Sequence, residues 1–76
     1  MKIFIQYCAS LGQQPLAAGL AAELEKNLED VAVDIERGPN QSELAVLVDG
    51  EQIFSRLEQM RYPTVPELIA ACRSRQ

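Results

Sequence analysis

Alternating apolar and polar residues open the chain, and this pattern is typical of a β-strand. Ile3, Ile5 and Tyr7 would share one face of that strand. Phe4 lies on the opposite face and makes it partly apolar as well. The pattern therefore predicts a strand over residues 2–7 that is covered on both sides.

A leucine at every fourth residue, from position 16 to position 28, predicts one apolar stripe along a helix. Proline suits the first turn of a helix because its missing N–H group would have no partner there, so Pro15 marks the start. Glu23 and Lys26 lie off the stripe, where water would reach them. We predict a helix over residues 14–29.

Three further strands follow from the apolar pattern. Residues 31–36 alternate, and the helix before them implies a right-handed crossover, so this strand should run parallel to the first. Residues 43–48 form a nearly continuous apolar run, which indicates a central strand. The Asp49-Gly50 pair predicts a tight hairpin turn that returns the chain as an antiparallel strand over residues 51–56.

The last part of the chain predicts a second helix. Residues 57–62 have no clean period and are expected to form a loop or a short turn. Thr64 and Glu67 have the spacing of a capping box, in which each side chain binds a backbone N–H of the first helical turn. The helix should cover residues 65–74, with Cys72 on its buried stripe.

The predicted order β-α-β-β-β-α is that of a small thioredoxin-like α/β domain. Its architecture would be an α+β two-layer arrangement, a mixed four-stranded sheet with two helices. We expect one domain over residues 1–76, since a chain of this size buries only about 60% of its unfolded surface. A ferredoxin-like βαββαβ fold or another two-layer α/β sandwich are the alternatives.

Composition narrows the range of partners. The net charge of −4 speaks against nucleic acid and anionic membrane surfaces as main partners. No apolar run approaches the ~20 residues of a membrane span, and the first strand is too short for a signal peptide. The expected location is therefore cytoplasmic.

The chain has two cysteines and no histidine. One chain therefore cannot assemble a zinc site of the usual type or an iron–sulfur cluster, and no metal or cofactor is expected. Cys-His and Ser-His catalysis are excluded in their usual forms. The sequence leaves open whether Cys8 and Cys72 form a disulfide, although pairing a strand tip with the end of the last helix is geometrically demanding.

Cys8 is the candidate redox thiol because it lies where the first strand gives way to a loop and a helix. The amino end of a helix favours a thiolate through its unpaired N–H groups and its dipole. Ser10, Leu11 and Gly12 form the loop beside it, and the Ser10 hydroxyl could bind the sulfur or satisfy local backbone. Cysteine is also a common small buried hydrophobe, which is the competing interpretation of Cys8.

Four segments of the chain carry a family resemblance: residues 7–12 with Cys8, the apolar strand 44–50 ending in glycine, Ile53 to Arg56, and Tyr62-Pro63 before the capped helix. Together they resemble the selenoprotein W, T and H group, the Rdx family. The resemblance implies a thioredoxin-like fold and thiol redox chemistry through a Cys-x-x-Cys or Cys-x-x-selenocysteine pair. Here Leu11 stands at the second redox position, and Gln41-Ser42 replaces the family's Thr-Gly pair.

Two hypotheses follow from this incomplete pair. In the first, the protein works through Cys8 alone and forms mixed disulfides with glutathione or a thiol-bearing partner protein. In the second, it is a non-catalytic protein-interaction module on the same fold, with Leu11 and Leu16 contributing apolar surface. Neither hypothesis makes the chain a complete disulfide reductase, because that activity requires a second thiol to release the substrate.

Overall fold

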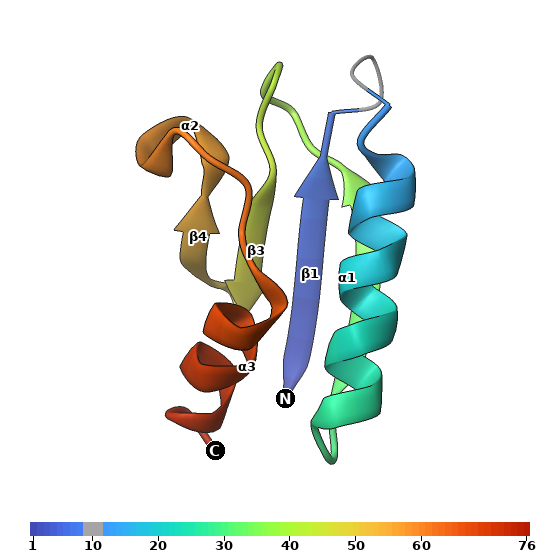
Figure 1. Ribbon diagram of the computed structural model, residues 1–76, viewed down its shortest axis with the longest axis vertical. Helices are drawn as coiled ribbons and strands as arrows, with labels where there is room; N and C mark the ends of the chain where they lie inside the picture. Colours follow the sequence, from blue (N-terminus) through green and yellow to red (C-terminus); the bar gives the residue numbers. More distant parts are fainter. Residues whose placement is uncertain (9–11) are drawn as a thin grey trace.

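Four strands and three helices make up the part of the chain that the computed structural model describes, residues 1–8 and 12–76. In chain order they are β1 (Lys2–Tyr7), α1 (Gln14–Asn27), β2 (Ala32–Arg37), β3 (Ala45–Val48), β4 (Glu51–Ser55), α2 (Arg56–Gln59) and α3 (Val65–Arg73). Figure 1 shows that β1 runs from the amino terminus toward the opposite end of the molecule, beside α1.

The sheet has the strand order β2-β1-β3-β4. β1 pairs in parallel with β2 and antiparallel with β3, so the predicted parallel pairing of the first two strands is confirmed. Ile5 of β1 stands opposite Ile35 on one side and Val46 on the other. The mixed four-stranded sheet matches the predicted thioredoxin-like fold.

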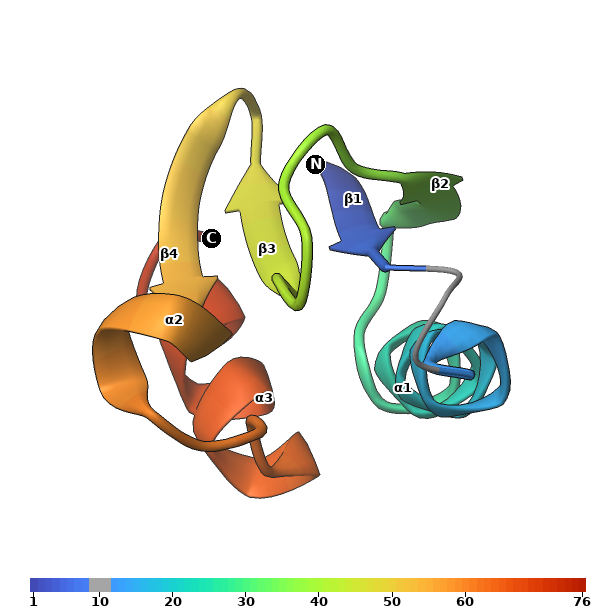
Figure 2. The ribbon, with the colours of Figure 1, turned by 90° about the horizontal axis from the view of Figure 1, so that it is seen from above.

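Both longer helices, α1 and α3, cover the same face of the sheet (Figure 2). The core between the layers contains fully buried side chains from both, among them Ile3, Ile5, Leu24 and Leu68. The prediction that β1 is covered on both sides was wrong. Its outer face carries the half-buried Phe4, and the Lys2 ammonium lies 5.1 Å from the centre of that ring.

The Asp49-Gly50 hairpin is confirmed, and it also ties β1 to the turn. Both residues have positive φ angles, 49° and 86°, as the tight turn between twisted strands requires. The Asp49 carboxylate accepts a hydrogen bond from the Lys2 backbone N–H at 2.8 Å. The Asp49 N–H in turn donates to the Lys2 carbonyl at 2.8 Å, so one turn residue fixes the beginning of β1.

The helices depart from the sequence prediction in two places. α1 ends at Asn27 instead of residue 29, because Leu28 turns to an extended conformation while its side chain stays in the core. α2 forms where a loop or short turn was predicted: the Ser55 hydroxyl accepts from the Glu58 N–H, and Met60 ends the helix with φ of 58°. Four residues are too few to display a helical period.

Both ends of the chain contact the turn that follows α1. The Met1 ammonium donates to the Asp30 carbonyl at 3.1 Å, and the Gln76 amide donates to the Glu29 carbonyl at 3.0 Å. Figure 1 shows N and C at the same end of the molecule. The carboxyl end of β1 lies at the opposite end.

The predicted capping box of α3 is confirmed and extended by an arginine. The Thr64 side chain accepts from the Glu67 N–H, and the Glu67 carboxylate accepts from the Thr64 N–H at 2.6 Å. Arg61 donates to both carboxylate oxygens at 2.7 Å. The Arg61 hydrogen bonds, followed by that of the Thr64 backbone, lower the pKa of Glu67 to about 2.

We expect Glu67→Gln to lower stability at neutral pH and to matter less in acid. A depressed carboxyl pKa stabilises the folded state above the ordinary pKa, and this contribution is lost as pH falls toward 2. Because the pair is exposed to solvent, the loss should be only about 1 kcal/mol at pH 7. Urea unfolding between pH 7 and pH 2 measures it. Arg61→Leu should remove most of the pH-dependent part, and a difference between parent and Glu67→Gln that is independent of pH would contradict the assignment.

Candidate functional site

Cys8 follows β1 directly, at the end of the molecule where α1 begins (Figure 1). The residue is buried, with 7% of its surface exposed. Of the predicted loop residues, Ser10 and Leu11 lie outside the described residues, and Gly12 is exposed with φ of 66°. Glycine adopts this left-handed conformation without steric cost, so it suits the return of the chain into α1.

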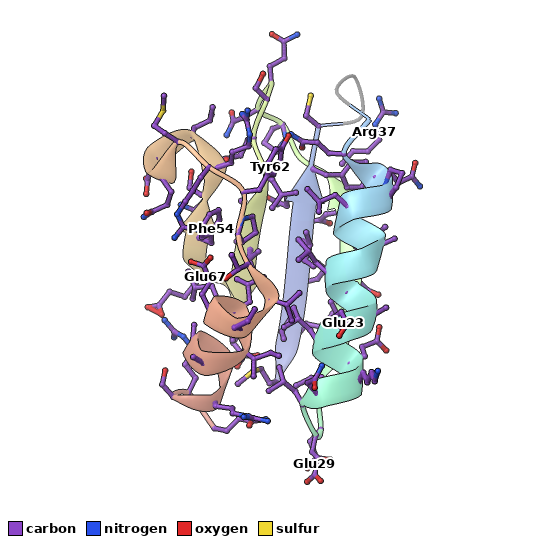
Figure 3. The ribbon with its side chains drawn as sticks, viewed as in Figure 1. Glu23, Glu29, Arg37, Phe54, Tyr62 and Glu67 are labelled. Atoms are coloured by element: carbon purple, nitrogen blue, oxygen red, sulfur yellow. The ribbon has the colours of Figure 1, made fainter. Side chains whose placement is uncertain are left out.

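Gln13 links Cys8 to a tyrosine from a distant part of the chain. Its side-chain carbonyl accepts a hydrogen bond from the Cys8 backbone N–H at 2.9 Å. Its amide nitrogen donates to the Tyr62 hydroxyl at 3.0 Å. Tyr62 lies in the segment between α2 and α3 (Figure 3). Gln13 is only 2% exposed, whereas Tyr62 is 39% exposed. The amide therefore uses both of its ends: its hydrogen bond to Cys8 is buried, and its hydrogen bond to Tyr62 is partly buried.

Arg56 extends this bridge to the loop before β3. Its guanidinium carbon lies 4.8 Å from the centre of the Tyr62 ring, and its Nη1 donates to the Ser42 carbonyl at 2.8 Å. Ser42 has φ of 63°, a conformation that favours glycine. We refer to Cys8, Gln13, Tyr62, Arg56 and Ser42 as the Cys8 network.

Sequence reasoning identified Cys8 but not Gln13 or Arg56 as parts of this arrangement. Gln13 occupies the N-cap position of α1, yet its side chain makes no capping bond. Ser, Thr, Asp and Asn are the usual N-cap residues. A glutamine just before the predicted helix could therefore have indicated a side chain with a role other than capping. Its long amide reaches away from the helix to the end of β1 instead.

Cys72 lies in the core, as predicted, and is fully buried in α3. Burial raises the pKa of its thiol, and the charge of Arg75 offsets part of that effect. The Arg75 guanidinium pairs with Glu51, next to the hairpin turn, so the end of α3 lies beside the beginning of β1. Cys8 lies beyond the other end of β1, on the order of 15 Å along the strand, so the two thiols are too far apart for a disulfide.

Within residues 1–8 and 12–76, no group of three or more His, Cys, Asp or Glu side chains could hold a metal ion. None of the helices in the same part of the chain is long and apolar enough to cross a membrane.

The model of the Rdx family matches residues 2–74. The chain belongs to the Rdx family. A crystal structure of a selenoprotein W-related protein from Vibrio cholerae has a TM-score of 0.78 and 25% identity, covering 96% of this chain and 92% of that one. A protein from Bordetella parapertussis has a TM-score of 0.77 and 24% identity, covering 99% and 96%. The comparison with curated proteins gave no match.

This membership confirms the resemblance that the sequence suggested and explains the strand order of the fold. In this Rdx protein a leucine stands three residues after the cysteine at the end of β1. The chain thus has the family's fold with one cysteine in the segment from Tyr7 to Gly12.

The two cysteines are expected to react at different rates. Cys8 should be alkylated by iodoacetamide in the native protein, because it lies at a strand end and 7% of its surface is exposed. Cys72 should react only in denaturant, because it is fully buried and its thiol pKa is raised. Peptide mass spectrometry after brief labelling separates the two sites. Equal labelling of both residues in the native protein would contradict this order.

Proposed function

We propose that this Rdx protein is a thiol redox protein that works through Cys8 alone. The observation that carries the proposal is the position of Cys8 between the end of β1 and the start of α1, with its backbone held by the buried Gln13 amide. Such a position favours a thiolate. Family membership supports redox chemistry in general terms.

The proposed reaction is thiol–disulfide exchange with glutathione or a glutathionylated partner protein. The Cys8 thiolate attacks the glutathione sulfur of the disulfide between glutathione and the partner protein. A Cys8–glutathione disulfide forms, and the partner protein leaves as a thiolate. A second glutathione thiolate then attacks the glutathione sulfur, restores the Cys8 thiolate and leaves as oxidised glutathione. In total, one mixed disulfide is exchanged for one glutathione disulfide: the free glutathione thiolate is oxidised to the disulfide level, and the sulfur of the partner protein is reduced to a thiolate. We place this cycle in the cytoplasm, where glutathione is reduced.

A second glutathione is needed because this chain offers no resolving thiol near Cys8. Cys72 is buried at the other end of β1, and Leu11 has no sulfur. Covalent complexes through Cys8 should therefore persist until an external thiol is added.

The test is incubation of the purified protein with oxidised glutathione, followed by intact-mass and peptide mass spectrometry. The parent should gain one glutathione on Cys8, and reduced glutathione should remove it. Cys8→Ser should show no adduct, whereas the matched control Cys72→Ala should behave as the parent does. No adduct on the parent, or an adduct that survives in Cys8→Ser, would refute the proposal.

A non-catalytic protein-interaction module is the second candidate, and one observation favours it. The four large hydrophobic residues that are exposed in the described chain are Leu16, Leu57, Met60 and Tyr62. They come from the first turn of α1, from α2 and from the segment after α2, all at the Cys8 end of the molecule (Figure 1). Contiguous apolar surface marks protein contacts, and a partner protein that bound at this end would cover these residues. A partner retained equally well by the parent and by Cys8→Ser would favour this function.

A further inference from the structure

We propose that Gln13 is a positioning residue for Cys8 and that it acts as one unit with Tyr62. This inference rests on the proposed function, since it concerns how the same thiol is held. Gln13 does not touch the partner molecule in this proposal; it fixes the backbone from which the Cys8 side chain projects.

The direction of each hydrogen bond in the bridge follows from elementary chemistry. A backbone N–H can only donate, so the Cys8 N–H requires the oxygen of the Gln13 amide. The amide nitrogen then faces Tyr62 and can only donate, so the Tyr62 oxygen must accept. The single proton of the Tyr62 hydroxyl consequently points away from Gln13. One orientation of the amide satisfies both partners.

Burial makes this orientation costly to change. Gln13 is 2% exposed, so a rotated amide would leave polar groups without partners and without water. The Arg56 guanidinium covers the Tyr62 ring and is itself held by the Ser42 carbonyl. Arg56 and the loop that contains Ser42 thus hold Tyr62, the hydrogen-bond partner of Gln13, in place.

The result for Cys8 is a fixed distance from the start of α1. Gln13 immediately precedes Gln14, the first residue of the helix, and it holds the peptide of Cys8. When the bridge is broken, the end of β1 can move relative to α1, and the thiolate loses part of the stabilisation from the amino end of the helix.

The experiment is the pH profile of Cys8 alkylation by iodoacetamide in the full-length protein. The variants are Gln13→Met, which keeps the side-chain length without hydrogen bonds, Tyr62→Phe, which keeps the ring, and the double variant. Gln14→Met is the matched control, because Gln14 is the exposed neighbour at the start of α1. Cys72 serves as an internal reporter, since it is fully buried and becomes reactive on global opening.

We expect Gln13→Met to move the midpoint of the profile to higher pH by about 0.5 pH unit, because the amino end of the helix would stabilise a displaced thiolate less. Tyr62→Phe should shift it in the same direction by less. The double variant should shift it no further than Gln13→Met alone, because the two residues act as a unit. Gln14→Met should leave the midpoint and the Cys72 rate unchanged.

Two outcomes would overturn the inference. Either the midpoint stays at the parent value in Gln13→Met while the protein loses stability, or Cys8 and Cys72 accelerate together, which is the signature of a merely structural role. Tyr62→Phe provides the same test with an intact core, should Gln13→Met fold poorly. Alkylation does not involve glutathione, so failure of the glutathione adduct would refute the proposed function without affecting this result.

Discussion

The Leu11→Cys variant is expected to acquire an internal disulfide couple that the parent chain lacks. Cysteines at positions 8 and 11 would have the three-residue spacing of Cys-x-x-Cys redox sites. A thiol at position 11 would attack a mixed disulfide on Cys8 and release the bound partner, which supplies the missing resolving step. The variant should therefore reduce protein disulfides without glutathione, whereas the parent should not.

Equilibration of the variant with dithiol buffers, followed by alkylation and mass spectrometry, gives its two-electron potential. Leu11→Ser is the matched control, because it introduces a polar side chain of similar size without a redox-active sulfur. A parent protein that reduced insulin disulfides with no glutathione present would contradict the expectation. So would a Leu11→Cys variant that formed no disulfide under oxidising buffers.

Truncating the centre of the core is expected to have the largest effect on stability. Ile5 is fully buried on the strand that lies between β2 and β3. Ile5→Ala removes buried methyl groups and leaves a cavity that the neighbouring strands cannot close, so it should cost about 3–4 kcal/mol. A domain of this size has on the order of 5–10 kcal/mol in total, so the variant should be close to unfolding at 37 °C.

Ile35→Ala is the matched control, because Ile35 is the register partner of Ile5 on the edge strand β2 and only partly buried. It should cost about half as much. Urea unfolding at 25 °C measures both free energies. Equal losses in the two variants would show that β1 is not the centre of the core.

The periodic parts of the sequence predicted the fold well, because burial dictates their pattern. The alternation in residues 2–7 and the leucine repeat placed β1 and α1, and Asp49-Gly50 placed the hairpin. The errors arose where packing between elements that are distant in sequence determines the structure. Coverage of the outer face at Phe4 depends on where α3 packs, which no local pattern contains.

The candidate site was predictable only in part. Cys8 could be selected because a thiol at a strand–helix junction is recognisable along the chain. Its partnership with Tyr62 was not, since Gln13 and Tyr62 are 49 positions apart and are brought together by packing. Ser42 and Arg56 likewise meet through the pairing of β3 and β4, which brings the loop before β3 beside the start of α2.

The position of the chain ends has a practical consequence for attaching this protein to other molecules. Met1 and Gln76 both contact the turn after α1, at the end of β1 remote from Cys8. A fluorescent label, a surface anchor or a fused carrier at either terminus would therefore lie at the end of the molecule remote from Cys8. Protein immobilised through its carboxyl terminus on a sensor chip would present every Cys8 in the same orientation to a partner in solution.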